Sequence, residues 1–203
     1  MLTGERIDDV RAGRIDAVVI GTSAGGIEAL GILLPALPAA CDLPYVVVLH
    51  MPPRERSPLV EVFARRCAIA VREAADKEPV EGGVAWFAPP DYHLMIETDF
   101  TFALSTEGPV NFSRPSIDVL FESAARAYGH SLLGIILTGA SADGAEGAAA
   151  VCAAGGVLIV QDPASAQMPL MPSAAMARAR PHAVASLQEI AGLLRTSALS
   201  RHR

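Results

Sequence analysis

The feature that most constrains this chain is the stretch 16–26, where an apolar run stops at a glycine and a serine follows in a tight turn. The pattern predicts a strand, a turn and then a helix. Gly21, Ser23 and Gly25 match the G-x-S-x-G spacing of a nucleophile elbow, in which the glycines let the backbone crowd together and the serine hydroxyl stand above a sheet edge. The helix that follows would direct its N-terminal amides toward that hydroxyl.

The same stretch also allows a phosphate-binding turn or a simple packing turn, because such spacing occurs by chance in glycine-rich chains. A dinucleotide-binding loop needs G-x-G-x-x-G, and a P-loop needs G-x-x-x-x-G-K-[ST]. Here Ser23 occupies the position of the second glycine, and no lysine follows. The context therefore weakens both phosphate-binding interpretations.

Composition sets the broad class. The chain has 203 residues, 51% of them hydrophobic, which is enough for one sizeable core, so we expect a single domain over 1–203 with its core at about 16–194. A net charge of -6 disfavours a nucleic-acid partner. The first apolar run is too short for a signal sequence or a membrane span, which predicts a cytoplasmic protein without direct membrane insertion. Three widely spaced cysteines predict neither a disulfide framework nor a zinc site.

Apolar runs alternate with helical patterns along the chain. This alternation predicts an α/β fold with a doubly wound, mostly parallel sheet, helices on both faces and an antiparallel hairpin. The expected strands are 17–21, 45–49, 69–73, 84–88, 132–137 and 157–161, with the hairpin at 93–97 and 100–105; the expected helices are 26–34, 59–66, 117–128, 145–154, 173–180 and 187–194.

Three chemically useful side chains follow three different buried strands. Ser23, His50 and Asp143 each come where a strand ends. In open α/β sheets, ligands bind outside the carboxyl ends of the strands. A hydroxyl, an imidazole and a carboxylate meeting there would supply a nucleophile, its base and the group that orients the base.

Each of these residues also has a purely structural interpretation. Ser23 could cap the following helix, His50 could be a satisfied histidine before a proline turn, and Asp143 could cap the helix near 145. Their joint placement favours a catalytic triad, with His93 in the hairpin as a structural residue. The chain order Ser, His, Asp differs from the Ser, Asp, His order of α/β-hydrolases, which argues against that superfamily.

At this point the sequence resembles the catalytic domain of CheB-type chemotaxis receptor methylesterases, over nearly the whole chain from about 16 to 194. The resemblance rests on several motifs in a fixed order, which together are highly specific. They are G-T-S-A-G-G at 21–26, H-M at 50–51, A-P-P-D-Y-H-L at 88–94, R-P-S-I-D-V-L-F at 114–121, L-T-G at 137–139, D-G at 143–144, Q-D-P at 161–163 and M-P at 171–172.

The resemblance implies hydrolysis of γ-glutamyl methyl esters on the cytoplasmic helices of methyl-accepting chemotaxis receptors, with release of methanol. Some relatives also deamidate receptor glutamines. Ser23 would then be the nucleophile, His50 the general base and later acid, and Asp143 the residue that holds His50 in its tautomer. The backbone amides of Ala24 and Ala140 are the candidates for an oxyanion hole. The chemistry requires neither a metal nor an organic cofactor.

Two departures from the family pattern matter. Family members commonly carry a receiver domain ahead of the catalytic domain, whereas about fifteen residues precede the first strand here, so we expect no receiver domain and a separate response regulator or kinase as a further partner. The position three before Asp143, often methionine in the family, is Ala140. The alternatives are a catalytically idle module that binds receptors or signalling partners, and a nucleotide-binding module.

Overall fold

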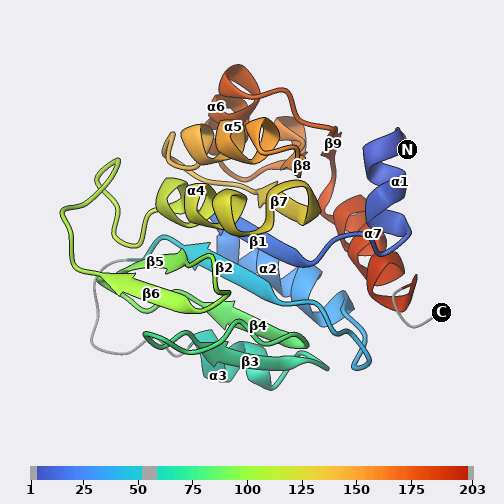
Figure 1. The fold of residues 1–203 in the computed structure, drawn as a ribbon. Coiled ribbons are helices and arrows are strands. Elements are labelled where there is room, and N and C mark those ends of the chain that lie inside the picture. The colour runs from blue at the N-terminus through green and yellow to red at the C-terminus, as the bar shows by residue number, and fades with distance from the viewer. Residues whose placement is uncertain (1–3, 52–58, 201–203) are drawn as a thin grey trace.

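A parallel sheet organises the molecule (Figure 1). The computed structural model describes residues 4–51 and 59–200. In this part of the chain the main sheet has seven strands in the order β3-β4-β2-β1-β7-β8-β9, and all neighbouring pairs are parallel. The strands are β1 (Ala17–Thr22), β2 (Tyr45–Leu49), β3 (Ala70–Glu73), β4 (Val84–Phe87), β7 (Leu132–Ile136), β8 (Val157–Gln161) and β9 (Ala183–Ala185).

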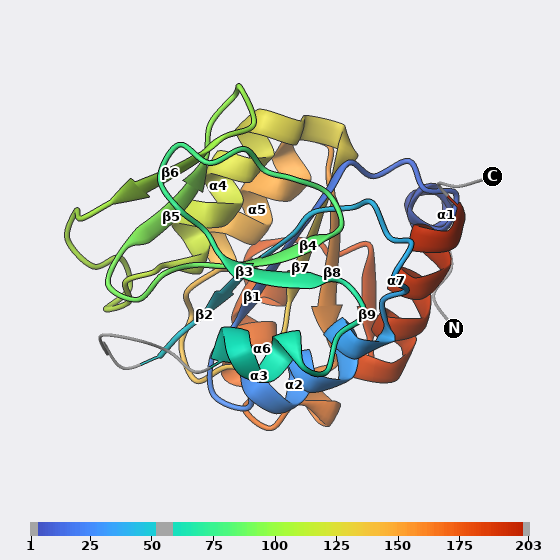
Figure 2. The same cartoon turned by 90° about the horizontal axis from the view of Figure 1, so that it is seen from below.

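Helices cover both faces of this sheet, as Figure 2 shows from below. The central strands β1, β2, β7 and β8 are buried at every position, which explains their unbroken apolar sequences. One face carries α1 (Glu5–Arg11), α2 (Gly26–Leu33), α3 (Leu59–Ala64) and α7 (Leu187–Ser200); the other carries α4 (Ile117–Tyr128), α5 (Ala145–Ala153) and α6 (Leu170–Arg178). Short 3-10 turns lie at Leu34–Ala36, Gly129–Ser131 and Pro163–Ser165.

The predicted doubly wound α/β fold is confirmed, and helix α4 illustrates why the pattern worked. Its apolar residues Ile117, Leu120, Phe121 and Ala124 are all fully buried, because they recur at helical spacing and form one face. The helix ends at Gly129, whose φ is +55°. This helix lies against β1, β7 and α5, so its N-terminus is held at the carboxyl edge of the sheet.

The predicted hairpin forms a sheet of its own. Strands β5 (His93–Ile96) and β6 (Phe102–Ser105) pair antiparallel as predicted, but they form a separate two-stranded sheet and do not extend the main one. The physical reason is their packing. Phe102 lies edge-on to Trp86 at 5.2 Å between ring centroids, and β5 contacts α4, so the hairpin covers a helix and a sheet face.

Two short elements escaped prediction, and the bounds of two helices differ, since α7 continues to Ser200 beyond the predicted end at 194. Helix α1 forms at the charged N-terminal segment because Ile7 and Val10 are fully buried in the same core cluster as α7. Strand β9 has three residues, too few for a periodic signal, and α6 begins at Leu170 instead of 173. Ser57 and Pro58, whose residue types suit the N-cap and the first position of the helix expected at 59–66, lie outside the described residues.

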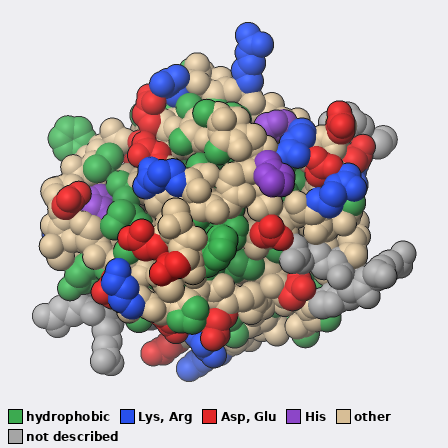
Figure 3. Space-filling view, in the orientation of Figure 1, with side chains coloured by type: hydrophobic (Ala, Val, Ile, Leu, Met, Phe, Trp, Pro, Cys, Tyr) green, Lys and Arg blue, Asp and Glu red, His purple; other side chains and the backbone are tan. Residues whose placement is uncertain are grey.

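The surface in Figure 3 carries acidic and basic side chains dispersed among one another. Among the helices of the described residues, none combines the length and the apolar character that crossing a bilayer requires.

Gly21 gives the first prediction, because a Cβ at this position of β1 would overlap the Cγ2 methyl of Ile117 at the start of α4. We expect Gly21→Ala to lower the free energy of unfolding by roughly 1–3 kcal/mol, since a β-branched neighbour cannot move aside cheaply. Urea unfolding measures this change. The matched control is Gly31→Ala in α2, where the nearest atom would lie 3.6 Å away and the helix should gain stability. Equal stability of wild type and Gly21→Ala would contradict the packing described here.

Candidate active site

Ser23 and His50 directly follow the carboxyl ends of two neighbouring strands, β1 and β2. Thr22 pairs with Leu49 at the carboxyl ends of β1 and β2, and the His50 amide donates to the Thr22 carbonyl at 3.0 Å. The Ser23 amide donates to the carbonyl of Thr138, in the loop that follows β7, at 3.0 Å. The parallel register therefore brings all three predicted loops to one edge of the sheet.

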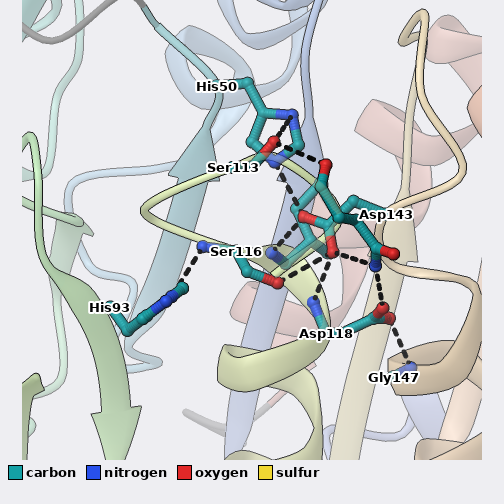
Figure 4. Close-up of polar contacts among 9 residues, drawn as sticks. His50, His93, Ser113, Ser116, Asp118, Asp143 and Gly147 are labelled. Carbon is teal, nitrogen blue, oxygen red and sulfur yellow. Dashed lines mark hydrogen bonds and ion pairs between the residues drawn. The ribbon is translucent and has the colours of Figure 1, made fainter. Parts of the chain in front are cut away.

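His50 and Asp143 form the polar centre of this edge (Figure 4). The distance from His50 Nε2 to Asp143 Oδ2 is 2.8 Å, and the two side chains are 11% and 0% exposed. An ionised carboxylate only accepts hydrogen bonds, so Nε2 carries the proton and Nδ1 keeps its lone pair. Nδ1 is therefore the nitrogen that can take a proton from a nucleophile.

The third predicted side chain is not joined to this pair. In residues 4–51 and 59–200, no hydrogen bond links Ser23 Oγ to His50, and the hydroxyl that contacts Nδ1 is that of Ser113, at 3.4 Å. That distance is long for a hydrogen bond from a hydroxyl. The structure thus brings His50 and Asp143 into contact and holds Ser23 on the adjacent strand end.

Asp143 accepts more hydrogen bonds than an ordinary helix cap would. Oδ2 accepts from His50 and from the Ile117 amide at 2.6 Å, and Oδ1 accepts from Ser116 Oγ at 2.8 Å, Asn111 Nδ2 at 3.1 Å and the Asp118 amide at 3.4 Å. Burial alone would raise the pKa of Asp143, but the hydrogen bonds from His50, Ile117, Asn111 and Ser116 lower it below its usual value. The buried carboxylate is therefore ionised.

The same contacts place Asp143 at the N-terminus of α4. Ser116 is the N-cap residue of α4, but its hydroxyl donates to Asp143 and does not accept from the amides of its own helix. Asp143 instead accepts from the first amides of α4, Ile117 and Asp118. The helix dipole thus stabilises the charge that orients His50.

A second buried carboxylate, Asp118, lies beside the first. Its Oδ1 accepts from the Gly147 amide at 2.7 Å and its Oδ2 from Asn111 Nδ2 at 2.8 Å, so the Asn111 amide bridges both carboxylates. Burial raises the pKa of Asp118 to about 6, the Gly147 amide opposes this rise, and the negative charge of Asp143 adds to it.

Sequence reasoning missed the roles of Asn111, Ser113 and Asp118. Asn111 and Ser113 lie in the loop 106–115, which carries no periodic pattern, and no sequence signal identified them. Asp118 lies within the recognised segment at 114–121, so a signal was present but no role followed from it. His93 is 2% exposed; its Nδ1 accepts from the Ser116 amide and its Nε2 donates to the Gly108 carbonyl. Both of its ring nitrogens are therefore occupied by backbone contacts.

The backbone amides of Ala24 and Ala140, the predicted oxyanion-hole donors, lie in the loops that follow β1 and β7. In the described part of the chain, the amides of Ala24 and Ala140 donate no hydrogen bond, although both residues are exposed. Thr138 ties their loops together, because its Oγ1 donates to the Ala24 carbonyl at 2.9 Å. Gly25 adopts a φ of +82°, and a Cβ there would collide with Gln167, so this tight turn requires glycine.

A hollow of about 190 Å³ opens beside His50. His50 and Met51 line it on one side. The 106–115 loop also lines it, through residues that include Pro109, Phe112, Ser113 and Arg114. Within the residues that the structure describes, no cluster of three His, Cys, Asp or Glu side chains could hold a metal ion.

Comparison with known proteins agrees with this fold. The chain superposes on the crystal structure of the Thermotoga maritima CheB methylesterase catalytic domain with a TM-score of 0.85 and 32% identity, covering 89% of this chain and 97% of that one. The family model for CheB methylesterase matches residues 18–194. The chain therefore belongs to the CheB methylesterase family.

Curated relatives extend the comparison. A Trichodesmium erythraeum protein named protein-glutamate methylesterase/protein-glutamine glutaminase is 38% identical over 78% of this chain and 46% of its own length. A Leptospira interrogans protein that bears the same name provisionally is 46% identical over 88% of this chain and 92% of its own length. The chain thus spans nearly all of the Leptospira protein and about half of the Trichodesmium one.

Asp118 gives a prediction on pH and stability. Its folded pKa of about 6 lies above the ordinary value of 3.8, so the folded state holds this proton more tightly than the unfolded chain. Its contribution to stability is therefore lost as pH rises from about 4 to 6. We expect Asp118→Asn to gain stability relative to wild type over that interval, by roughly 1–3 kcal/mol. Denaturant unfolding at pH 4, 5, 6 and 7 measures the difference.

Carboxyl ¹³C NMR provides the independent control for this prediction. One aspartate resonance should titrate with a midpoint near pH 6 in wild type and be absent in Asp118→Asn. Glu146→Gln, which removes an exposed carboxylate paired with Arg178, should leave that resonance unchanged. A stability difference that stays constant from pH 4 to 7 would rule out the elevated pKa.

Proposed function

We propose that this protein is a serine hydrolase that demethylates γ-glutamyl methyl esters on methyl-accepting chemotaxis receptors and releases methanol. In this proposal Ser23 is the nucleophile, His50 the general base and then acid, and Asp143 the residue that orients His50. The observation that carries it is the 2.8 Å contact between His50 and Asp143 at the strand end next to Ser23, in a chain of the CheB methylesterase family.

The first half of the reaction forms an acyl-enzyme. Ser23 Oγ attacks the ester carbonyl carbon while His50 Nδ1 takes the hydroxyl proton. The tetrahedral intermediate then collapses, and His50 returns that proton to the departing methoxy oxygen, which leaves as methanol. Asp143 keeps Nε2 protonated throughout, so that Nδ1 faces the reacting atoms.

The second half regenerates the enzyme. A water molecule gives a proton to His50 Nδ1 and attacks the acyl carbon, and the Ser23–acyl bond breaks as the proton passes to Ser23 Oγ. The products are the glutamate side chain and free Ser23. If the substrate is a glutamine, the same steps release ammonia in place of methanol, which is the second activity in the names of the curated relatives.

The negative charge of each tetrahedral intermediate needs aimed donors. The amides of Ala24 and Ala140 meet that requirement in principle, because neither has a partner within the described residues and their loops are tied by Thr138. One donor of this kind typically contributes on the order of 10²-fold to 10³-fold in rate.

The proposal places the protein in the cytoplasm, where the receptor helices that bear the esters would be its partner. A separate response regulator or kinase would be a second partner. The rival interpretation is a catalytically idle module that binds receptors or signalling proteins, and the missing hydrogen bond between Ser23 and His50 is the observation that favours it. A serine-directed fluorophosphonate separates the two, because an unactivated serine does not react.

The assignment of the nucleophile is testable because two serines lie near His50. We expect Ser23→Ala to reduce methanol release from a carboxyl-methylated chemoreceptor fragment by at least about 10⁴-fold. Ser113→Ala should stay within about 10-fold of wild type, since its contact with Nδ1 is a long, neutral hydrogen bond. The reverse pattern would make Ser113 the nucleophile. Inactivity of the wild-type protein toward both the fragment and the fluorophosphonate would favour the binding module.

Asp143 gives the second test of the mechanism. Asp143→Asn should lower kcat/KM by about 10⁴-fold, because an amide in place of the carboxylate favours the wrong tautomer of His50. Glu146→Gln, three positions further on at an exposed site, is the matched control and should retain full activity. Circular dichroism of both variants checks that the fold is kept. An Asp143→Asn protein with near wild-type turnover would remove the orienting role.

A further inference from the structure

Residues 110–113 form a two-residue turn of an unfavourable kind. Val110 and Ser113 exchange both backbone hydrogen bonds, at 3.1 and 2.9 Å, so Asn111 and Phe112 are the two central residues. Both have positive φ, +49° and +61°. Turns of this geometry favour asparagine followed by glycine, because a side chain at positive φ is strained.

Phe112 is therefore the unexpected residue of this turn. It carries a bulky side chain in the left-handed region, and the ring is 104% exposed, as open to solvent as in an isolated peptide. Among the described residues, the next most exposed large hydrophobic side chain is Leu170 at 51%. Phe112 thus combines strain with the loss of hydrophobic burial.

The candidate active site holds this turn in place. Asn111 Nδ2 donates to Asp118 and Asp143, and Ser113 Oγ lies 3.4 Å from His50 Nδ1. On the far side, the guanidinium of Arg114 donates to Asp91 and to two carbonyls of the same loop. These contacts fix the backbone on either side of Phe112.

The Phe112 ring also lies at the hollow beside His50. Phe112 lines the hollow of about 190 Å³ that His50 and Met51 line from the sheet edge. The hollow adjoins His50, so a protein substrate whose side chain reacts beside His50 would bring its backbone close to the rim on which Phe112 lies. A fixed, exposed aromatic side chain at the rim of a site is typical of a contact that contributes much of the binding energy.

We propose that Phe112 is a specificity residue that contacts the protein substrate outside the reacting group. This inference rests on the proposed function. Its partner is an apolar side chain on the substrate helix, about one turn from the esterified glutamate, because residues three or four positions apart share a helix face. Phe112 binds the helix and takes no part in the chemistry at Ser23.

The test separates binding of the protein substrate from the chemistry of the site. KM and kcat for methanol release from a carboxyl-methylated chemoreceptor fragment report on both, whereas the rate of labelling by a small fluorophosphonate reports on the reactive serine alone. Phe112→Ala should raise KM for the fragment by about 10-fold and leave the labelling rate within about 2-fold of wild type.

Phe100→Ala is the matched control. Phe100 also has positive φ, +62°, and is 46% exposed, but it lies in the turn between β5 and β6, where its ring packs on Tyr128. It should change neither KM nor the labelling rate. Phe112→Gly relieves the strain of positive φ, so it should be more stable than wild type while showing the same rise in KM. A structural role for the ring would not produce that combination.

Three results would overturn the inference. The first is an unchanged KM for the fragment in Phe112→Ala, and the second is a labelling rate that falls in proportion to turnover. The third is an equal rise in KM in Phe100→Ala. A wild-type protein that is labelled at Ser23 but releases no methanol from the fragment would instead overturn the proposed function, and the substrate contact with it.

Discussion

The buried charge of Asp143 is the interaction on which the site depends. A carboxylate with no exposed surface is costly unless donors surround it, and this one accepts from His50, Ser116, Asn111 and the first amides of α4. One group therefore fixes the imidazole, caps a helix and anchors the loop that bears Phe112. These three parts come from distant stretches of the chain. The geometry of the site and the packing of α4 on the sheet therefore depend on each other.

The fold and the location of the site could be predicted from sequence because both follow from local patterns. Unbroken apolar runs become strands covered on both faces, and parallel strands deliver the residues after them to one edge. Ser23, His50 and the loop of Asp143 met there for that reason. Asp143 lies beside His50 as expected, while the catalytic roles of Ser23, His50 and Asp143 stay predictions.

The supporting residues could not be predicted, because nothing local determines them. Asn111 acquires its importance only when α4 brings Asp118 next to Asp143, and Ser113 approaches His50 only through the folded loop. The separate hairpin sheet has the same origin. Its pairing is local and was foreseen, but its docking onto α4 depends on burying Phe102 against Trp86, a contact between distant segments.

The two ends of the strand order have a consequence for how the protein behaves in a crowded solution. An open sheet leaves two edges whose unpaired backbone groups can recruit a strand from another molecule. Here β9 is only three residues long, and β3 has four, with the charged Arg72 and Glu73 exposed at its end. Arg72 is held over the Trp86 ring and near Glu81. Brevity at one edge and charge at the other discourage intermolecular strand pairing, so the open architecture carries its own protection against aggregation.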